Sequence, residues 1–533
     1  MTKLDEEIKK RRTFAIISHP DAGKTTITEK LLLFGGAIVQ AGAIKAKKAA
    51  KYTTSDWMEL EKQRGVSVST SVMCFEYNGS IINLLDTPGH ADFSEDTYRT
   101  LTAVDSVLMV IDSTKGVEER TKKLMDVCRL RNIPVITFMN KLDREGMNPF
   151  DLLEDIEKQL NIQPVPLSWP VSMGKTFKGV YNITDQTLLS FKPGQSRYDK
   201  DAVTKVTEQK LLNELIGDDL AVKLNEDLEM IKHLLPGFDV QLFLEGMITP
   251  VFFGSAINNF GVLELLQNII KLSPYPRDMN TEQRTVHPDD EKMTGLVFKI
   301  HANMDPKHRD RIAFMRICSG TFNRGMKVFH VRLGRDMKIS NPMTFMAQNR
   351  SITEEAYPGD IVGLHDTGLI KIGDTFTEGE ILNFTGIPSF SPEVFRRVIN
   401  KNPMKSKQLN TGLMQLSEEG VVQLFKTVLD GQLLLGAVGE LQFDVVRFRL
   451  ENEYTAICDY SPVEISFAYW IKSSDKQQFE KFQSENKSKL ASDKDDNLVF
   501  LFKGKWEFDH IKKLYQYIEF YRTSECNVRD KVI

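Results

Sequence analysis

Residues 14–26 of this chain, FAIISHPDAGKTT, constrain its fold more than any other stretch. The apolar run at 14–17 predicts a buried parallel strand, and the pattern at 25–34 predicts a helix. A strand that leads through a loop into a helix aims backbone N–H groups and the positive end of the helix dipole at that loop. The stretch therefore predicts an α/β domain with an anion site at its first loop.

The loop follows the phosphate-binding pattern G-x-x-x-x-G-K-[ST], with Ser18 in place of the first glycine. Lys24 supplies a cation for the β- and γ-phosphates, and Thr25 offers a hydroxyl to Mg²⁺. The residues predicted to contact phosphate are Ser18, His19, Pro20, Asp21, Ala22, Gly23, Lys24, Thr25 and Thr26.

A second motif lies at residues 81–90, IINLLDTPGH. Its apolar strand ends in Asp86, and ligands of open α/β sheets bind at the carboxyl ends of the strands. Asp86 can hold Mg²⁺ through water, because this ion prefers oxygen ligands and keeps several waters. Gly89 lets its N–H approach a γ-phosphate. The predicted nucleotide contacts here are Asp86, Thr87, Pro88, Gly89 and His90.

Residues 35–65 lack periodicity and carry a basic cluster, formed by Lys45, Lys47, Lys48 and Lys51. This segment is either a solvated loop or one that orders over a nucleotide or against RNA phosphates. The hydroxyl of Ser67, just beyond it, completes a Mg²⁺ shell if the segment folds over the γ-phosphate.

Two further motifs indicate which base is bound. Asn140, Lys141, Leu142 and Asp143 follow an apolar strand at 135–139. The Asp143 carboxylate can accept two hydrogen bonds from N1–H and N2–H₂ of guanine, a donor pair that adenine lacks. Asn140 can donate to N7, and the Lys141 stem can lie on the ring. After a later apolar strand, the backbone of Ser255 and Ala256 can donate to guanine O6. GTP or GDP is the expected ligand.

The succession of patterns along the chain predicts a multidomain fold: an α/β nucleotide-binding domain, then an all-β barrel, then an α+β domain. We expect the nucleotide domain at 1–280, with an inserted subdomain at about 169–246 because the connection there is long. Its helical stretch, 199–233, is either a partner surface or a solvated excursion. Short alternating strands predict the barrel at 290–385, and mixed strands and helices the last domain at 390–533.

Composition excludes several classes of protein. No apolar run in the 533 residues reaches the ~18 needed to span a membrane, and the charged N-terminus lacks a signal-peptide core. Five scattered cysteines argue against a disulfide framework and predict a cytoplasmic protein. The net charge of −4 is not that of a polycation. Two segments could still contact RNA locally. They are the charged loop 304–311 and the lysine-rich tail at 472–505, with the aromatics Phe479, Phe482 and Trp506.

Four motifs in this order, each at a strand end, resemble the GTPase family of P-loop proteins. The chain looks like a translational GTPase, with a barrel of the elongation factor Tu type after the nucleotide domain. It is most similar to the bacterial peptide chain release factor 3 family. The matching runs are at residues 17–26, 55–59, 93–99, 298–310 and 436–445.

This resemblance implies a ribosome-dependent GTPase of translation termination that uses GTP and Mg²⁺. It would promote dissociation of the stop-codon-reading class I release factors after peptide release, without reading codons itself. His90 would orient the attacking water. Thr25, Ser67 and, through water, Asp86 would hold Mg²⁺, although many GTPases carry threonine where Ser67 stands. The expected partners are the ribosome and class I factors, and the expected form is a cytoplasmic monomer.

Three alternatives remain open from the sequence. A translocase similar to elongation factor G is the nearest, but the chain is short for that factor's two further C-terminal domains. An ATP-dependent kinase would prefer adenine, against the motif at 140–143. A GTP-bound scaffold that does not hydrolyse its nucleotide would share the same motifs.

Overall fold

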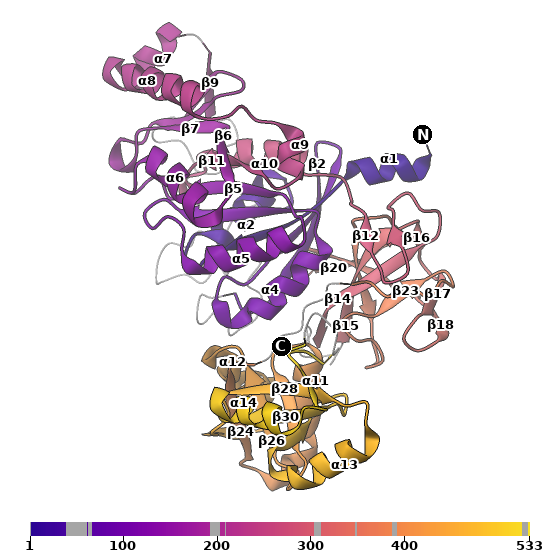
Figure 1. Ribbon diagram of the computed structural model, residues 1–533. Helices are drawn as coiled ribbons and strands as arrows, with labels where there is room; N and C mark the ends of the chain where they lie inside the picture. Colours follow the sequence, from indigo (N-terminus) through magenta and orange to yellow (C-terminus); the bar gives the residue numbers. More distant parts are fainter. Residues whose placement is uncertain are drawn as a thin grey trace.

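The computed structural model describes residues 2–38, 61, 67–191, 203–207, 209–302, 311–346, 349–385, 392–524 and 531–532. The basic cluster from Lys45 to Lys51 and almost all of the charged loop 304–311 lie outside these ranges. Figure 1 shows three parts: an α/β part with the N-terminus, a β-rich part to its right, and a C-terminal part below both. The predicted multidomain fold class is confirmed.

The first part is a mainly parallel sheet with strand order β2-β3-β1-β4-β5-β11-β6, in which only β2 runs antiparallel to its neighbour. Its strands are β1 (Arg11–Ser18), β2 (Ser71–Tyr77), β3 (Ser80–Asp86), β4 (Ser106–Asp112), β5 (Val135–Asn140), β6 (Gln163–Pro166) and β11 (Ile248–Phe253). Its helices are α1 (Lys3–Lys10), α2 (Lys24–Phe34), α4 (Ser94–Thr100), α5 (Glu119–Leu130), α6 (Pro149–Leu160), α9 (Val240–Leu244) and α10 (Val262–Leu272).

Both faces of this sheet are covered. Side chains of α5 and α6 belong to one buried apolar cluster, and those of α2 and α10 to another on the opposite face. Strands buried on both faces carry continuous apolar runs, which explains why β1 and β4 are buried at every position. The carboxyl ends of β1, β3, β5 and β11 meet at one edge, where α/β sheets bind ligands.

An inserted unit follows β6. It holds a four-stranded antiparallel sheet and two helices, in chain order β7 (Ser168–Val171), β8 (Gly179–Asn182), β9 (Thr187–Phe191), β10 (Val203–Val206), α7 (Gln209–Ile216) and α8 (Asp218–Leu234). Buried Trp169 anchors the unit, because its ring packs on Phe253 and its Nε1–H donates to Asp227 of α8 at 3.0 Å. The predicted helix at 199–233 is wrong at its start, since β10 pairs with β9.

The second part is a curled antiparallel sheet with order β18-β17-β23-β14-β15-β22-β19. Its strands include β14 (Thr294–Ala302), β15 (Arg311–Ser319), β17 (Lys327–His330), β18 (Arg335–Lys338), β19 (Met343–Met346), β20 (Asn349–Ile352), β22 (Ile361–His365) and β23 (Thr375–Thr377). Two short pairs add β12 (Met279–Asn280), β13 (Thr285–Val286), β16 (Phe322–Asn323) and β21 (Glu355–Ala356). β19 also pairs with β2 at Met346 and Met73, so the sheets of the first two parts are continuous.

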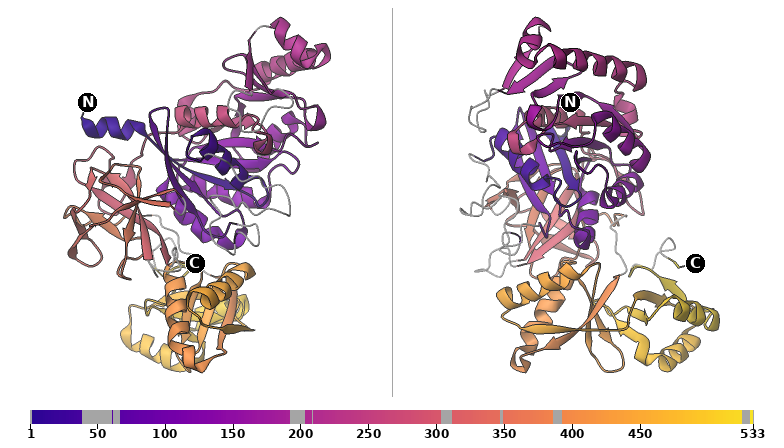
Figure 2. Two further views of the ribbon diagram at one scale, coloured as in Figure 1. Left: turned by 180° about the vertical axis from the view of Figure 1, so that it is seen from behind. Right: turned by 90° about the vertical axis from the view of Figure 1, so that its left-hand side faces the viewer.

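The third part repeats one βαββαβ pattern twice, and the halves lie side by side in the right view of Figure 2. The first half is β24 (Val394–Asn400), α11 (Ser406–Glu418), β25 (Gln423–Thr427), β26 (Leu433–Ala437), α12 (Glu440–Glu453) and β27 (Cys458–Pro462). The second is β28 (Phe467–Lys472), α13 (Lys476–Glu485), β29 (Leu490–Ser492), β30 (Leu498–Phe502), α14 (Lys505–Leu514) and β31 (Glu519–Tyr521). Pairing of β25 with β29 joins them into one eight-stranded sheet. Of the tail aromatics, Phe482 is core and Trp506 is exposed.

No helix in the described ranges is both long and apolar enough to cross a membrane.

A buried ion pair connects the first two parts. Arg316 of β15 donates to Asp105, which precedes β4, at 2.7 Å, and to the Ala103 carbonyl at 2.7 Å. Both charged side chains are only 2% exposed. A second contact between these parts joins Arg11 of β1 to Asp360 at 2.8 Å. Removing one partner of such a pair leaves a buried charge uncompensated.

We therefore expect Arg316→Met to lower the free energy of unfolding by about 3 kcal/mol, because buried Asp105 would be left with the Arg277 N–H at 2.9 Å and the more distant Arg277 guanidinium at 3.9 Å. The matched control is Arg324→Met in the same part, whose ion pair with Glu354 is exposed and is worth at most about 1 kcal/mol. Calorimetric unfolding of the full chain measures both. Equal losses of unfolding free energy in the two variants would contradict the view that burial makes the Arg316 ion pair costly to break.

Candidate functional site

One open cavity of about 320 Å³ lies at the carboxyl edge of the parallel sheet. Four chain segments line it: the β1–α2 loop, the segment after β3, the loop after β5 and the loop after β11. Its lining residues are Ser18, His19, Pro20, Asp21, Gly23, Lys24, Thr25, Thr26, Ser67, Gly89, His90, Asn140, Lys141, Asp143, Arg144, Ala256 and Ile257. The structure thus brings together side chains from all four predicted motifs.

The β1–α2 loop has the backbone that its sequence predicts. Gly23 precedes α2 with φ of +93°, a conformation that favours glycine. A Cβ atom at this position would lie 2.3 Å from Asn140 Nδ2, so a side chain is excluded by contact as well as by backbone strain. Lys24 and Asp86, both buried, form an ion pair at the loop. The N-terminus of α2 therefore opens into the cavity beside a lysine and a carboxylate.

The Asn140 side chain connects three of the four segments. Its Nδ2 donates to the Ala22 carbonyl at 2.7 Å, and its Oδ1 accepts from the Ala256 N–H at 2.9 Å. The sequence assigned this amide to guanine N7. In the structure its bonds go to the loops after β1 and β11, so Asn140 holds these segments together, and the contact with guanine N7 stays a prediction.

Asp143 lines the cavity, and buried Ser255 lies beside it. The Ser255 hydroxyl donates to Asp143 Oδ1 at 2.6 Å, which orients the carboxylate predicted to accept from guanine. The neighbouring Lys141 donates to Asp112 at 2.7 Å, so its stem is held beside the same loop. Although burial acts against it, the hydrogen bonds that Asp112 accepts from Lys141 and Thr114 lower its pKa, so this carboxylate is ionised at neutral pH.

The predicted backbone contacts to guanine O6 would compete with hydrogen bonds inside the chain. The Ser255 N–H donates to the Phe260 carbonyl at 3.1 Å, and the Ala256 N–H donates to Asn140. Both donors therefore have partners within the chain. Of the residues predicted to meet the base, Asp143 and Lys141 line the cavity.

The segment after β3 carries Thr87, Pro88, Gly89 and His90. Thr87 is buried, and its hydroxyl donates to the Ile16 carbonyl of β1 at 2.7 Å, which holds this segment against the first loop. Nδ1 of His90 accepts from the Asp92 N–H at 3.2 Å and lies 3.1 Å from Asp92 Oδ1. His90 lines the cavity with its Nδ1 engaged, which leaves Nε2 as the nitrogen able to meet a ligand.

Two residues that line the cavity, Arg144 and Ile257, were not predicted from the sequence. Each stands one position beyond a predicted motif, so an extension of those motifs by one residue would have found them. His19, which was predicted, is fully buried, and burial lowers its pKa despite Glu118 at 4.0 Å. A neutral imidazole at this position adds no positive charge to the phosphate loop at neutral pH.

The proposed Mg²⁺ donors have suitable chemistry. Thr25 and Ser67 line the same cavity, and the Asp86 carboxylate is in contact with Lys24 at its edge. Two hydroxyls and a carboxylate form the oxygen set that Mg²⁺ prefers. These residues fit a magnesium ion held jointly with a phosphate ligand.

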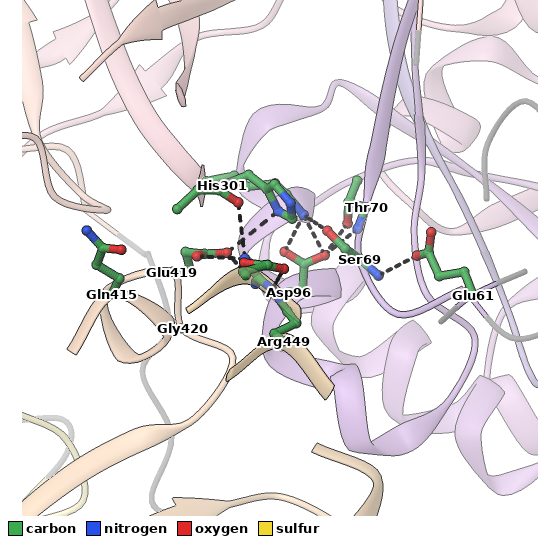
Figure 3. A network of polar contacts seen from close by, with 12 residues as sticks. Glu61, Ser69, Thr70, Asp96, His301, Gln415, Glu419, Gly420 and Arg449 are labelled. Atoms are coloured by element: carbon green, nitrogen blue, oxygen red, sulfur yellow. Dashed lines mark hydrogen bonds and ion pairs between the residues drawn. The ribbon is translucent and has the colours of Figure 1, made fainter. Parts of the chain in front are cut away.

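The segment at residues 67–70 reaches the other two parts of the molecule through the polar network in Figure 3. Lys299 of β14 donates to Ser69 at 2.7 Å and to both oxygens of Asp96 at 3.0 Å. Asp96 also accepts from the N–H and hydroxyl of Thr70, at 2.6 and 2.7 Å. Although burial acts against it, this set of donors lowers the pKa of Asp96, so the carboxylate is charged.

The same network continues into the third part. Arg449 of α12 donates to both oxygens of Glu419, at 2.7 and 3.1 Å, and to the Ala302 carbonyl at the end of β14, at 3.1 Å. Arg449 and Glu419 are each only 2% exposed. All three parts of the molecule therefore meet close to the cavity.

The comparisons with known families agree with this architecture. Residues 9–275, half of the chain, match the elongation factor Tu GTP binding domain. Residues 292–379 match elongation factor G domain 2, and residues 384–512 match the C-terminal domain of class II release factor RF3. The chain belongs to the translational GTPases and is of the release factor 3 type. This family binds guanine nucleotides and acts with the ribosome.

One solved structure similar to this GTPase is a protein from Thermus thermophilus. It aligns with a TM-score of 0.69 and 23% sequence identity, over 88% of this chain and 69% of that chain. The similarity supports the fold of the GTPase.

The Gly23 geometry generates a prediction. We expect Gly23→Ala to weaken GDP binding by roughly tenfold or more, since the new methyl meets Asn140 and the backbone strain alone costs about 1–3 kcal/mol. Fluorescent GDP titration measures the affinity. Gly36→Ala is the matched control, because Gly36 has φ of +76° and a Cβ atom there would meet nothing within 4 Å, and we expect unchanged GDP affinity. Tight GDP binding by Gly23→Ala would contradict the role of this close approach.

Proposed function

We propose that this GTPase is stimulated by the ribosome and promotes dissociation of class I release factors after peptide release. The observation that carries the proposal is the match of residues 384–512 to the C-terminal domain of class II release factors, on a chain whose first domain holds the nucleotide cavity. The proposal leaves codon reading to the class I factor.

In this proposal the nucleotide lies along the carboxyl edge of the sheet. The N–H groups of the β1–α2 loop and the Lys24 ammonium bind the β- and γ-phosphates. Asp143, oriented by Ser255, accepts from guanine N1–H and N2–H₂. Thr25, Ser67 and Asp86 would hold Mg²⁺, which neutralises charge that develops on the phosphates.

Hydrolysis requires a positioned water. His90 lines the cavity on the segment after Asp86, with Nε2 available to hold the water that attacks the γ-phosphate. Among the cavity-lining residues, the arginine is Arg144, which follows the base-recognition motif rather than the phosphate loop. We infer that intrinsic hydrolysis is slow and that the ribosome completes the site, since activation in trans accelerates GTPases by ~10³–10⁵.

The nucleotide state is read by two segments. Ser67 and the segment from Gly89 to His90 both line the cavity, and each lies two positions from a residue, Ser69 or Asp92, that contacts another domain. A γ-phosphate that orders these segments, and whose loss releases them, would act as the switch. Monomeric action suits this scheme, because all three parts that meet at the switch belong to one chain.

We expect His90→Ala to bind GTP normally and to lose at least ~100-fold in ribosome-stimulated turnover, the usual contribution of a group that positions or activates a reactant. Phosphate release on ribosomes and nucleotide titration measure the two quantities. His233→Ala, an exposed histidine of α8, is the control and should retain full activity. Normal stimulated turnover in His90→Ala would refute its assigned role.

We expect Asp143→Asn to lose ~1–3 kcal/mol of guanine affinity, by analogy with a bidentate base contact, and to gain affinity for xanthine nucleotide. Competition titration with GDP, XDP and ADP gives the preference. Asp151→Asn, on the exposed start of α6, is the control and should keep the guanine preference. A wild-type preference for ADP would instead favour an ATP-dependent activity.

The termination role is tested on ribosomes stalled after peptide release with a labelled class I factor bound. We expect this GTPase with GTP to accelerate both phosphate release and departure of the label. Phosphate release without departure would refute recycling and leave the GTPase activity. Absence of phosphate release with and without ribosomes would favour a non-hydrolysing scaffold, and stimulated movement of messenger RNA would favour a translocase.

A further inference from the structure

The N-terminus of α12 lacks a capping side chain of its own. Its N-cap residue is Gly439, which has no side chain to accept from the first N–H groups of the helix. Gln442 Oε1 accepts from the N–H of Gly439, the N-cap residue, and from the N–H of Val438, the residue before it. The helical N–H of Leu441 is instead bonded to a residue 349 positions earlier in the chain.

That residue is Asp92, two positions beyond His90. Its Oδ2 accepts from the Leu441 N–H at 2.8 Å, so a carboxylate of the first domain caps a helix of the third. The approach is close: a Cβ atom at Gly439 would lie 2.1–2.3 Å from the carboxyl atoms of Asp92. Only a residue without a side chain leaves room for this contact.

The other side of Asp92 faces His90. The Asp92 N–H donates to His90 Nδ1 at 3.2 Å, and Asp92 Oδ1 lies 3.1 Å from the same nitrogen. One aspartate therefore accepts from the helix end through Oδ2 and donates its backbone N–H to the imidazole. Because the Oδ2 contact fixes the position of Asp92, its loss would let the N–H that orients His90 move.

Apolar packing supports the same link. Phe93, buried next to Asp92, packs with Val445 of α12, and Val68, Val421, Leu441 and Phe448 surround the pair. The His90 ring stands edge-on to the Phe93 ring, with centroids 6.3 Å apart. Two adjacent residues, one polar and one aromatic, thus connect the imidazole to one helix of the third domain.

We propose that Asp92 is a positioning residue for GTP hydrolysis, which holds His90 in its working orientation only while α12 of the third domain is docked on it. The inference rests on the proposed function, in which His90 orients the attacking water. The rate of GTP hydrolysis would then depend on where the third domain lies, the domain that matches release factor RF3. A ribosomal or protein partner that shifts the third domain would then change the rate of hydrolysis without touching the nucleotide.

The test uses the full chain on ribosomes, with kcat, the ribosome concentration for half-maximal rate, and GDP affinity measured separately. We expect Asp92→Ala to lower kcat at least tenfold with GDP affinity unchanged. Asp92→Asn retains an oxygen for Leu441 and should stay within about threefold of the wild-type kcat. Asp92→Asn as slow as Asp92→Ala would overturn the hydrogen-bonding account.

A change in the other domain gives an independent test. We expect Gly439→Ala to lower kcat in the same way, because its methyl displaces the Asp92 carboxylate. In an Asp92→Ala background the same change should cost less than twofold, because the displaced carboxylate is already gone. Glu440→Ala is the control at the same helix end: its exposed side chain pairs with Arg396, and kcat should not change.

Two further outcomes would overturn the inference: wild-type kcat in Asp92→Ala or in Gly439→Ala, or losses that multiply in the double variant. These outcomes are distinguishable from failure of the proposed function. If wild-type turnover is not stimulated by ribosomes, or His90→Ala is as fast as wild type, the proposed function fails. If His90→Ala is slow while Asp92→Ala is not, only the role of Asp92 fails.

Discussion

The two hydrogen bonds of the Asn140 side chain are the constraint on which the nucleotide site depends. One amide atom binds the carbonyl of Ala22 and the other the N–H of Ala256, so the ends of β1, β5 and β11 are held at fixed separation. The side chain is only 2% exposed, and a buried amide that lost either partner would be left unsatisfied at a cost of ~1–3 kcal/mol. The close approach of Gly23 follows from this arrangement.

The site is also built into an interface between domains. Lys299 ties Ser69 and Asp96 to the second domain, and Arg449 ties Glu419 to the Ala302 carbonyl, so buried charges meet within a few residues of the cavity. Buried ion pairs contribute modest net stability, because desolvation offsets their attraction, but a lost partner is expensive. Such contacts stabilise one arrangement of the three domains and disfavour small displacements from it. A change at the phosphates would therefore shift the domains between distinct arrangements.

Much of this architecture could be predicted from local pattern. The strand ending at Asp86 and the helix beginning near Lys24 lie within one or two residues of expectation, because parallel strands buried on both faces carry continuous apolar runs. The strand β10 was missed because a short edge strand in a lysine-rich stretch has too few residues to show its period. The partners of the Ser255 and Ala256 amides were missed because they depend on loops far away in sequence, at Asn140 and Phe260.

The sequence by itself determined the order of the four motifs, the residue types offered to phosphate and guanine in our proposal, and the succession of α/β, β-rich and α+β domains. These features are local, since they follow from the period of the apolar residues and from the chemistry of single side chains. Only the tertiary structure decided that Asn140 joins three loops and that Asp92 caps a helix of the third domain. Those contacts join residues more than one hundred positions apart, and the free energy that selects them arises only when the domains pack and exclude water from the buried polar groups.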